Sequence, residues 1–295
     1  MTQNEKIKLT VITPITALAN HLENLATWLA RIFDESIEVY LIHDKSDTQT
    51  GPELNELMKK LQNPKIYFIE GEFGSPGMAR NQAIKLAKGD WVCFWDADDL
   101  PIIESVIDLM NKEFNKGGDC IIASYIERDV KRNLSINQGF NDNFEVAVGL
   151  NPGLWRFFFT KSSLAETEFT NLRMGEDQLF LAEYLNVNRQ IRIFPYYTYT
   201  YIKNQEFSLT SSKSALSDIV KAAKGTLKII NKSKSDHSFL IGIMFARQIA
   251  TGIKRGNLKC KMLAISTLIK GFFFSNSKSK KWILKGFSVV LVKDG

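Results

Sequence analysis

The chain has 295 residues, of which 44% are hydrophobic and 24% charged, the balance of an ordinary globular protein. This length fits one large domain with an appendage, or two domains. Three cysteines, Cys93, Cys120 and Cys260, are too widely spaced for a disulfide framework or a zinc pattern, and the first two predict core thiols in a reducing cytosol. Residues 1–6 contain no apolar run and predict no secretory signal.

The net charge of +6 is unevenly distributed along the chain. Residues 221–295 contain 16 Lys and Arg but only two acids, Asp236 and Asp294, so this segment carries +14 and residues 1–220 carry −8. Such asymmetry is typical of a basic tail for an anionic surface, attached to a catalytic body of different charge.

Short apolar runs alternate with helical patterns through the first half of the chain. Leucines recur at helical spacing between the first and second runs, and alanines do so between the third and fourth, up to a helix stop predicted at Gly89. Alternating strands and helices predict an α/β fold with a mostly parallel sheet covered on both faces. The runs that predict strands are residues 9–13, 39–42, 66–69, 91–95 and 120–123.

Three carboxylates crowd the end of the fourth predicted strand, at residues 96–99. Like charges that close repel one another unless a counter-charge is present. Asp96 and Asp98 leave the same face of a continuing strand, and oxygen ligands suit Mg²⁺ or Mn²⁺. The alternative is a solvated acidic turn in which Asp99 caps the next helix.

Polar residues also follow the other predicted strands, at the edge where parallel sheets bind ligands. Residues 42–47 form a plain turn, or they place Asp44 to accept a hydrogen bond from a nucleobase N–H. Residues 71–81 are glycine-rich and open a helix, which lets backbone N–H groups approach a phosphate, with Arg80 as an added cation. The alternative for this stretch is a flexible loop with Arg80 on a solvated face.

The order of these motifs resembles the family 2 glycosyltransferases of GT-A fold over about residues 7–215. The resemblance is most specific over residues 77–99, and it implies a Rossmann-like sheet and an inverting transferase that depends on a nucleotide sugar and a metal. His43 stands where the family usually has Asp, and Lys45 where it usually has Gly. The motifs that carry the resemblance are Pro14 and residues 43–47, 77–81, 89–91 and 96–99.

The resemblance also implies roles for individual residues. The aspartate matching Asp44 contacts the base, and the arginine matching Arg80 helps to hold the donor. Asp96 contacts the donor ribose or the metal, and Asp98 is the metal ligand, with Mn²⁺ or Mg²⁺ as the cofactor. The residues that we predict to bind the donor are Thr13, Pro14, Asp44, Arg80, Asp96, Ala97 and Lys203. For Lys203 a solvated lysine on an edge strand is the alternative.

The middle of the chain supplies the predicted acceptor side. Burial explains the aromatic run of residues 155–159, but Trp155 is predicted to form a platform for an acceptor sugar. Glu176 and Asp177 fall in the first turn of a helical pattern, where acids complement the helix dipole. The resemblance implies more, because this pair matches the family's pair whose Asp is the general base: Asp177 takes the proton of the acceptor hydroxyl, and Glu176 contacts the acceptor. The family's Ser-Leu-Thr ending, where polar groups close over the donor diphosphate, is matched at residues 208–210.

From about residue 216 the pattern is helical and basic, and the resemblance fades. No stretch has the roughly 18 apolar residues of a transmembrane helix. Basic amphipathic segments suit lying in an anionic bilayer interface. The alternatives are a helical bundle with solvated lysines and a homodimer interface.

We therefore predict a GT-A catalytic domain over residues 1–215, followed by a basic amphipathic helical region over 216–295. Within the domain, about residues 1–125 bind the nucleotide sugar and 126–215 form the acceptor side. The predicted enzyme, a hexosyl- or N-acetylhexosaminyltransferase, moves a sugar from a nucleoside-diphosphate sugar to a hydroxyl of a growing surface glycan such as lipopolysaccharide or capsule. UDP is favoured as the nucleotide only by Asp44 and the resemblance.

The predicted location is cytoplasmic, peripheral on the inner membrane, where the anionic surface and a glycan or lipid-linked glycan acceptor are the partners. Two other functions were weighed. A sugar-1-phosphate nucleotidyltransferase needs a glycine-rich loop after the first strand, which residues 13–18 lack. A non-enzymatic binder of nucleic acid or another anionic surface leaves the ordered carboxylates without a purpose, so no nucleic acid is expected as a partner.

Overall fold

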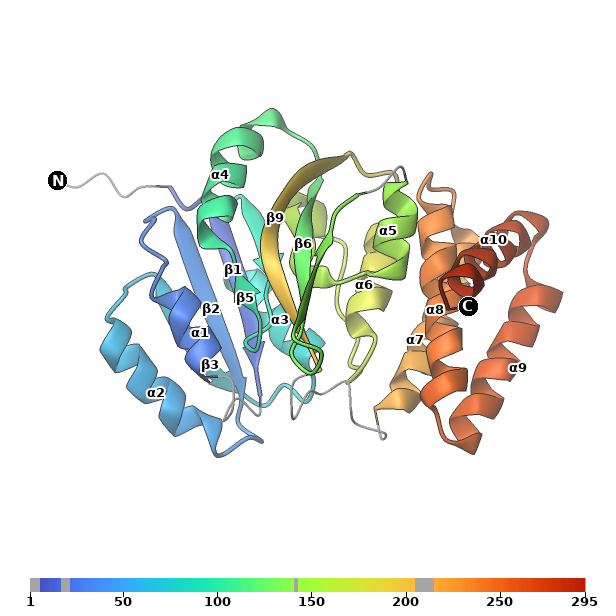
Figure 1. Ribbon diagram of the computed structural model, residues 1–295, viewed down its shortest axis with the longest axis horizontal. Coiled ribbons are helices and arrows are strands. Elements are labelled where there is room, and N and C mark those ends of the chain that lie inside the picture. Colours follow the sequence, from blue (N-terminus) through green and yellow to red (C-terminus); the bar gives the residue numbers. More distant parts are fainter. Residues whose placement is uncertain (1–5, 17–21, 141–142, 205–214, 295) are drawn as a thin grey trace. The chain divides into compact units, whose positions relative to one another are not determined.

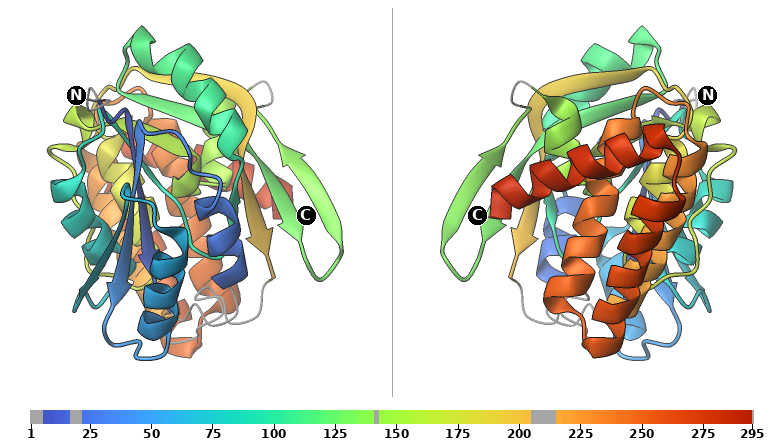
Figure 2. Two further views of the ribbon diagram at one scale, coloured as in Figure 1. Left: turned by 90° about the vertical axis from the view of Figure 1, so that its left-hand side faces the viewer. Right: turned by 90° about the vertical axis from the view of Figure 1, so that its right-hand side faces the viewer.

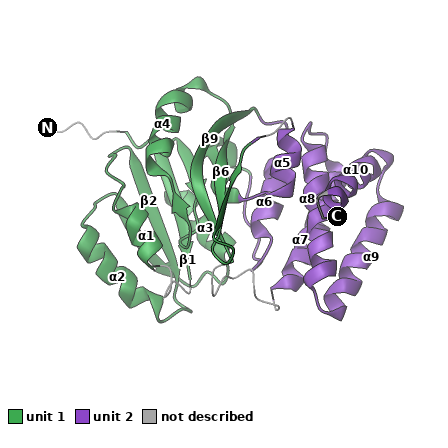
Figure 3. Ribbon diagram, in the orientation of Figure 1, with its two compact units in different colours: residues 1–139, 154–166, 190–207 green, residues 140–153, 167–189, 208–295 purple. Residues whose placement is uncertain are grey.

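The computed structural model describes residues 6–16, 22–140, 143–204 and 215–294 (Figure 1). The chain packs into two compact units, which are described one at a time (Figure 3). The first unit comprises residues 1–139, 154–166 and 190–207, and the second comprises residues 140–153, 167–189 and 208–295. The domain boundary expected at residue 215 stays a prediction.

A mixed sheet of nine strands forms the first unit, in the order β3-β2-β1-β4-β8-β6-β9-β5, with β7 paired to β6. Four parallel strands form one half, namely β3 (Ile66–Gly71), β2 (Ile37–Asp44), β1 (Leu9–Ile15) and β4 (Trp91–Phe94). In the other half β6 (Cys120–Asp129) runs parallel to β9 (Ile191–Lys203), whereas β5 (Leu100–Pro101), β7 (Leu134–Gln138) and β8 (Phe157–Thr160) run antiparallel to their neighbours. All five predicted strands are therefore confirmed.

Helices cover both faces of this sheet, as predicted. One face packs its apolar side chains against α1 (Leu22–Leu29), α2 (Thr50–Leu61) and α4 (Ile103–Glu113). The other face is covered by α3 (Pro76–Leu86), which buries Ala79 and Ala83. Strands buried on both faces explain why their sequences read as continuous apolar runs. Short 3₁₀ turns complete the unit, η1 (Phe114–Lys116), η2 (Leu154–Arg156) and η3 (Ser162–Leu164).

The parallel register brings the carboxyl ends of β1, β2, β3 and β4 to one edge. Ile15 lies opposite His43, and Asp44 lies opposite Gly71. The Trp95 N–H donates to the Ile12 carbonyl at 3.1 Å, so the turn after β4 begins beside the end of β1. The polar residues that follow these strands therefore share an edge.

The second unit is helical. The helices are α5 (Phe144–Leu150), α6 (Glu176–Tyr184), α7 (Leu216–Lys232), α8 (Ser238–Arg255), α9 (Leu258–Phe274) and α10 (Ser277–Asp294). The apolar α8 lies at the centre of this unit and contacts α5, α7, α9 and α10. Figure 2 shows α9 and α10 packed against it. None of the described helices is long and apolar enough to cross a membrane.

Candidate active site

The acidic turn after β4 is held by three other elements of the first unit. The Asp96 N–H donates to the Tyr199 hydroxyl of β9 at 3.0 Å. The Asn24 side-chain amide of α1 donates to the Asp98 carbonyl at 3.0 Å. Together with the contact between Trp95 and β1, these bonds fix the backbone on which Asp96 and Asp98 stand.

Asp99 has a structural task in this turn. Its carboxyl is only 1% exposed and accepts hydrogen bonds from the Ile202 N–H at 2.7 Å and from the Tyr199 hydroxyl at 3.0 Å. Burial, reinforced by the charges of Asp98 and Asp96, raises the pKa of the Asp99 carboxyl well above its usual range, although both hydrogen bonds oppose the shift. The alternative of a solvated turn with Asp99 as a helix cap is wrong, because β9 takes both carboxyl oxygens.

Arg80 and Asp96 form an ion pair at this turn. An Nη of Arg80 lies 3.1 Å from an Oδ of Asp96, and the arginine side chain is buried while the aspartate side chain is 39% exposed. The alternative with Arg80 on a solvated face is therefore wrong. Its helix begins at Ser75, whose hydroxyl accepts from the Met78 N–H. Asp98 is half-buried, so Asp96 and Asp98 both keep exposed surface.

Asp44, at the end of β2, ties the glycine-rich loop to the sheet. One carboxylate oxygen accepts from the N–H groups of Phe73 (3.0 Å) and Gly74 (2.7 Å), and the other accepts from the Ser46 N–H (3.0 Å). Burial alone raises the pKa of the Asp44 carboxyl, but the hydrogen bonds from Ser46, Gly74 and Phe73 outweigh it and lower the pKa to about 2. The group is therefore an anion at neutral pH.

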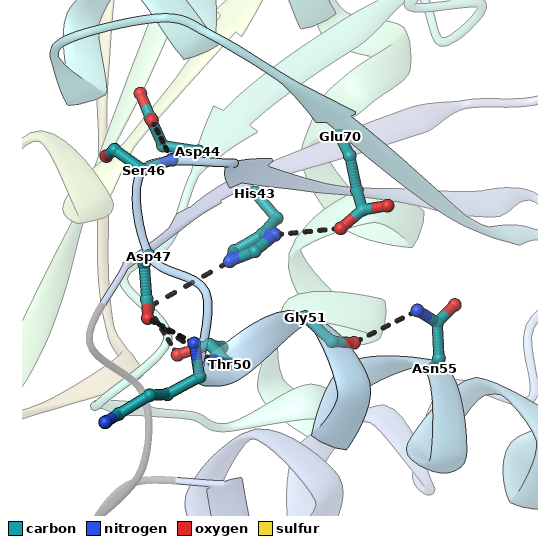
Figure 4. Close-up of polar contacts among 9 residues, drawn as sticks. His43, Asp44, Ser46, Asp47, Thr50, Gly51, Asn55 and Glu70 are labelled. Atoms are coloured by element: carbon teal, nitrogen blue, oxygen red, sulfur yellow. Dashed lines mark hydrogen bonds and ion pairs between the residues drawn. The ribbon is translucent and has the colours of Figure 1, made fainter.

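His43 points to the other side of β2, as Figure 4 shows. It is 2% exposed, and its ring lies between two carboxylates, 3.2 Å from Glu70 and 3.9 Å from Asp47. These residues line a pocket of about 330 Å³ together with Lys45 and Asn55. Asp47 also accepts from the Thr50 N–H, so the predicted turn is present beside the Asp44 site.

The other residues of the first unit that were predicted to bind the donor are buried, half-buried or paired with another charged side chain. Thr13 is fully buried, Ala97 is nearly so, and Pro14 is half-buried. Lys203 forms an ion pair with Glu127 at 3.2 Å. Their predicted donor contacts stay predictions.

Trp155 belongs to the core of the first unit. Its ring stacks on Tyr199 and Tyr201, with ring centroids 4.8 and 5.5 Å apart, and meets Tyr125 edge-on at 4.4 Å. The side chain is 7% exposed, so little of its surface remains for a sugar. Burial explains this tryptophan, and its role as an acceptor platform stays a prediction.

Glu176 and Asp177 lie in the second unit, in the first turn of α6, as predicted. Glu176 is buried and Asp177 is half-buried. The helix follows Gly175, whose φ of +82° and whose Cβ position 3.1 Å from Ala222 of α7 both favour glycine. Their catalytic and acceptor roles stay predictions, and the Ser-Leu-Thr match at residues 208–210 lies outside the described residues.

Two carboxylates of the turn suit a divalent cation. Among the described residues, no three His, Cys, Asp or Glu side chains form a metal-binding group. Asp99 is engaged by β9, so Asp96 and Asp98 are the acids of the turn with exposed surface. Mg²⁺ and Mn²⁺ are commonly held by one or two carboxylates together with substrate phosphates, so this pair fits a cation that binds with a nucleotide diphosphate.

The sequence prediction missed the residues that support the turn, Asn24, Tyr199 and Ile202. Tyr199 lies in β9, and its partner Asp99 is 100 positions away in the sequence. Asn24 lies within a helical pattern, and nothing in the sequence around it indicates that its side chain hydrogen-bonds to the turn.

Comparison with known proteins agrees with the fold. Residues 10–176 match the family model for glycosyl transferase family 2, so the chain belongs to this family. A poly(ribitol-phosphate) beta-glucosyltransferase of Bacillus spizizenii is 24% identical over 210 residues, which are 65% of this chain and 32% of that protein. The poly(ribitol-phosphate) beta-N-acetylglucosaminyltransferase TarP of Staphylococcus aureus is 25% identical over 67% of this chain and 63% of its own length. The chain thus spans about a third of the first relative and less than two thirds of the second.

Solved structures share the fold. The structure of S. aureus TarS 1–349 in complex with UDP-GlcNAc has a TM-score of 0.71 at 17% identity, covering 97% of this chain and 91% of that one. The mannosyltransferase PcManGT from Pyrobaculum calidifontis, in complex with GDP-Man and Mn²⁺, has a TM-score of 0.56 at 15% identity, covering 97% and 86%. The predicted GT-A fold with added C-terminal helices is confirmed.

Proposed function

We propose that this chain is a glycosyltransferase that uses a UDP-sugar, depends on Mn²⁺ or Mg²⁺, and inverts the anomeric centre. The observation that carries the proposal is the acidic turn, in which Asp99 is engaged by β9 while Asp96 and Asp98 keep exposed surface, at the same edge of the sheet as Asp44. A solved neighbour with UDP-GlcNAc and another with Mn²⁺ support the choice of nucleotide and metal.

Each residue of the edge has a task in this proposal. Asp44, anionic at neutral pH, accepts the base N–H while it holds the loop at Phe73 and Gly74. Arg80 orients Asp96 through their ion pair. Asp96 and Asp98 would hold the cation, whose positive charge would stabilise the negative charge of the diphosphate leaving group.

The transfer itself needs one proton movement. Asp177 takes the proton of an acceptor hydroxyl, whose oxygen attacks the anomeric carbon as the bond from that carbon to the diphosphate breaks. The nucleophile arrives on the face opposite the leaving group, so the configuration inverts. A charge-spread, oxocarbenium-like transition state is expected, as in glycoside hydrolysis.

The proposed acceptor is a hydroxyl of a cell-surface polymer. Relatives that are 24–28% identical to this chain over the aligned residues are named for poly(ribitol-phosphate), which makes a polyol-phosphate chain the first acceptor to test, ahead of lipopolysaccharide or capsule. We further infer that the enzyme works at the cytoplasmic face of an anionic membrane, because residues 221–295 carry +14 and a lipid-linked acceptor would be met there.

A nucleotide-sugar panel tests the donor. We expect nucleotide release from a UDP-sugar that requires Mn²⁺ or Mg²⁺ and rises when a polyol-phosphate or glycan acceptor is added. Release of nucleotide diphosphate, with no pyrophosphate, separates glycosyl transfer from nucleotidyl transfer. Turnover of GDP-sugars alone would overturn the UDP assignment, and full turnover in excess chelator would overturn the metal assignment.

A further inference from the structure

An exposed apolar stripe runs along α9 of the second unit. Its members recur at intervals of three or four residues, so they share one face of the helix. Their side chains are 46–75% exposed, far above what a packed helix shows for residues of this size. We call this set the α9 stripe: Leu258, Met262, Ile265, Ile269 and Phe273.

The opposite face of α9, which packs onto the unit, is made of small residues. Cys260, Ala264, Thr267 and Gly271 are the buried positions of the helix. An amphipathic helix of a globular protein normally buries its large apolar side chains and exposes its polar ones. On α9 the large apolar residues face outward, so packing within the unit does not account for them.

Lysines border the α9 stripe on both sides. At 100° per residue, Lys259 and Lys270 fall on one flank and Lys261 on the other, and all three are exposed. Residues 237–293 contain 11 Lys and Arg and no Asp or Glu. An apolar band with cationic borders is the pattern of a helix that lies in the interface of an anionic membrane.

The same charges disfavour other occupants. A second copy docked stripe to stripe would bring lysine borders together, and residues 237–293 offer no carboxylate to pair with them. A soluble polyanion would pair with the lysines but would leave the apolar side chains in water.

We propose that the α9 stripe is the part of this chain that inserts into the anionic bilayer, with Lys259, Lys261 and Lys270 on the lipid headgroups. This inference rests on the membrane location proposed above and names the surface responsible. It narrows the basic tail of 75 residues, 221–295, to one face of one helix.

Vesicle sedimentation of the 295-residue chain tests the proposal. We expect binding to vesicles of phosphatidylcholine mixed with phosphatidylglycerol, and much weaker binding to pure phosphatidylcholine. The variant Leu258→Ser/Met262→Ser/Phe273→Ser should bind the mixed vesicles at least about 10-fold more weakly, because apolar burial supplies part of the affinity. Its control is Val130→Ser/Val187→Ser, which removes exposed apolar side chains elsewhere and should bind like the wild type.

The contribution of the three lysines is tested against a control variant of the same net charge. Lys259→Gln/Lys261→Gln/Lys270→Gln should weaken binding about 100-fold, on the scale expected for three cations at an anionic surface. The control Lys60→Gln/Lys85→Gln/Lys131→Gln removes three exposed lysines of the first unit, so it has the same net charge and should bind like the wild type.

Insertion of the α9 stripe into the bilayer is measured separately, by fluorescence quenching. The fluorescence of Met262→Trp should be quenched by brominated lipid well beyond that of the wild type, whereas Val187→Trp should show no added quenching.

The outcomes separate this inference from the proposals it rests on. If the triple serine variant and the triple glutamine variant of α9 both bound vesicles like the wild type, the α9 assignment would be overturned and the membrane location would stand. No vesicle binding at all, with Mn²⁺-dependent release of UDP intact, would overturn the location and this inference but not the transferase. Dimers in place of vesicle binding, dissolved by the serine variant, would assign the stripe to a second copy. Binding to inorganic polyphosphate in place of vesicles, unaffected by the serine variant, would assign the lysines to a soluble polyanion.

Discussion

Tyr199→Phe is the substitution that most directly tests how the acidic turn is built. The Tyr199 hydroxyl donates to Asp99 and accepts from the Asp96 N–H, both at 3.0 Å, while the ring stacks on Trp155. Phenylalanine keeps the ring and its stacking, so the substitution removes two hydrogen bonds and creates no large cavity.

The expected loss of stability follows from what happens to the two hydrogen-bond partners, Asp99 and the Asp96 N–H, when the Tyr199 hydroxyl is removed. A hydrogen bond to a charged group contributes about 1.5–3 kcal/mol, and a buried N–H left without an acceptor costs about 1–3 kcal/mol. We expect Tyr199→Phe to lower the free energy of unfolding by about 2–4 kcal/mol and to weaken UDP binding about 10-fold, because the turn that bears Asp96 loses an anchor.

Tyr201→Phe is the matched control. Tyr201 lies two residues along the same strand, and its ring also stacks on Trp155, at 5.5 Å. We expect that control to change stability by less than about 1 kcal/mol. Urea unfolding followed by circular dichroism, and calorimetry with UDP and Mn²⁺, measure both effects. Equal losses from the two variants would show that the hydrogen bonds of the Tyr199 hydroxyl do not account for the effect, and would refute their role in supporting the turn.

Four further outcomes follow from the structure. Asp98→Ala should abolish Mn²⁺-dependent UDP binding with an unchanged fold, which calorimetry and circular dichroism check together. Asp177→Asn should keep donor affinity and lower kcat by about 100-fold or more, and an unchanged kcat would move the base elsewhere. Gly286→Ala should destabilise the second unit by about 1–3 kcal/mol in thermal unfolding, because its Cβ would lie 2.3 Å from the Gly242 carbonyl oxygen. The free energy of unfolding should fall by about 1–2 kcal/mol as the pH drops from about 4 to about 2, because the fold lowers the pKa of Asp44 to about 2 and the ionised carboxylate stabilises the fold. This stabilisation is complete above about pH 4 and is lost as the pH falls through the lowered pKa. Asp44→Asn should flatten this part of the pH profile measured by urea unfolding.

The strands and the site edge could be predicted because their signals are local. Runs of apolar residues mark strands that are buried on both faces, and parallel strands end at one edge wherever the helices fall between them. The task of Asp99 could not be predicted, because its partners come from a strand 100 positions later in the chain. The same holds for Trp155, whose burial depends on tyrosines of β9.

Two patterns in the sequence have more than one physical cause. Gly89 was predicted to stop a helix, but α3 ends at Leu86, and a Cβ on Gly89 would lie 2.6 Å from the Thr10 N–H nitrogen. The glycine is required by this close approach between segments. On α9 both faces are apolar in sequence, so periodicity alone gives no sign that the small residues pack inward and the large ones face out.

The three aspartates of the turn show how one local motif divides between structure and chemistry. Ionised carboxylates this close would repel one another, and the fold reduces the repulsion in two ways. It buries Asp99 against two hydrogen-bond donors of β9, and it pairs Asp96 with Arg80. Asp98, which is half-buried in the same turn, is the residue predicted to hold the cation. A divalent cation bound there would attract both the carboxylate and the donor diphosphate, so we expect nucleotide and metal each to raise the affinity for the other, and both affinities to be lost together in Asp98→Ala.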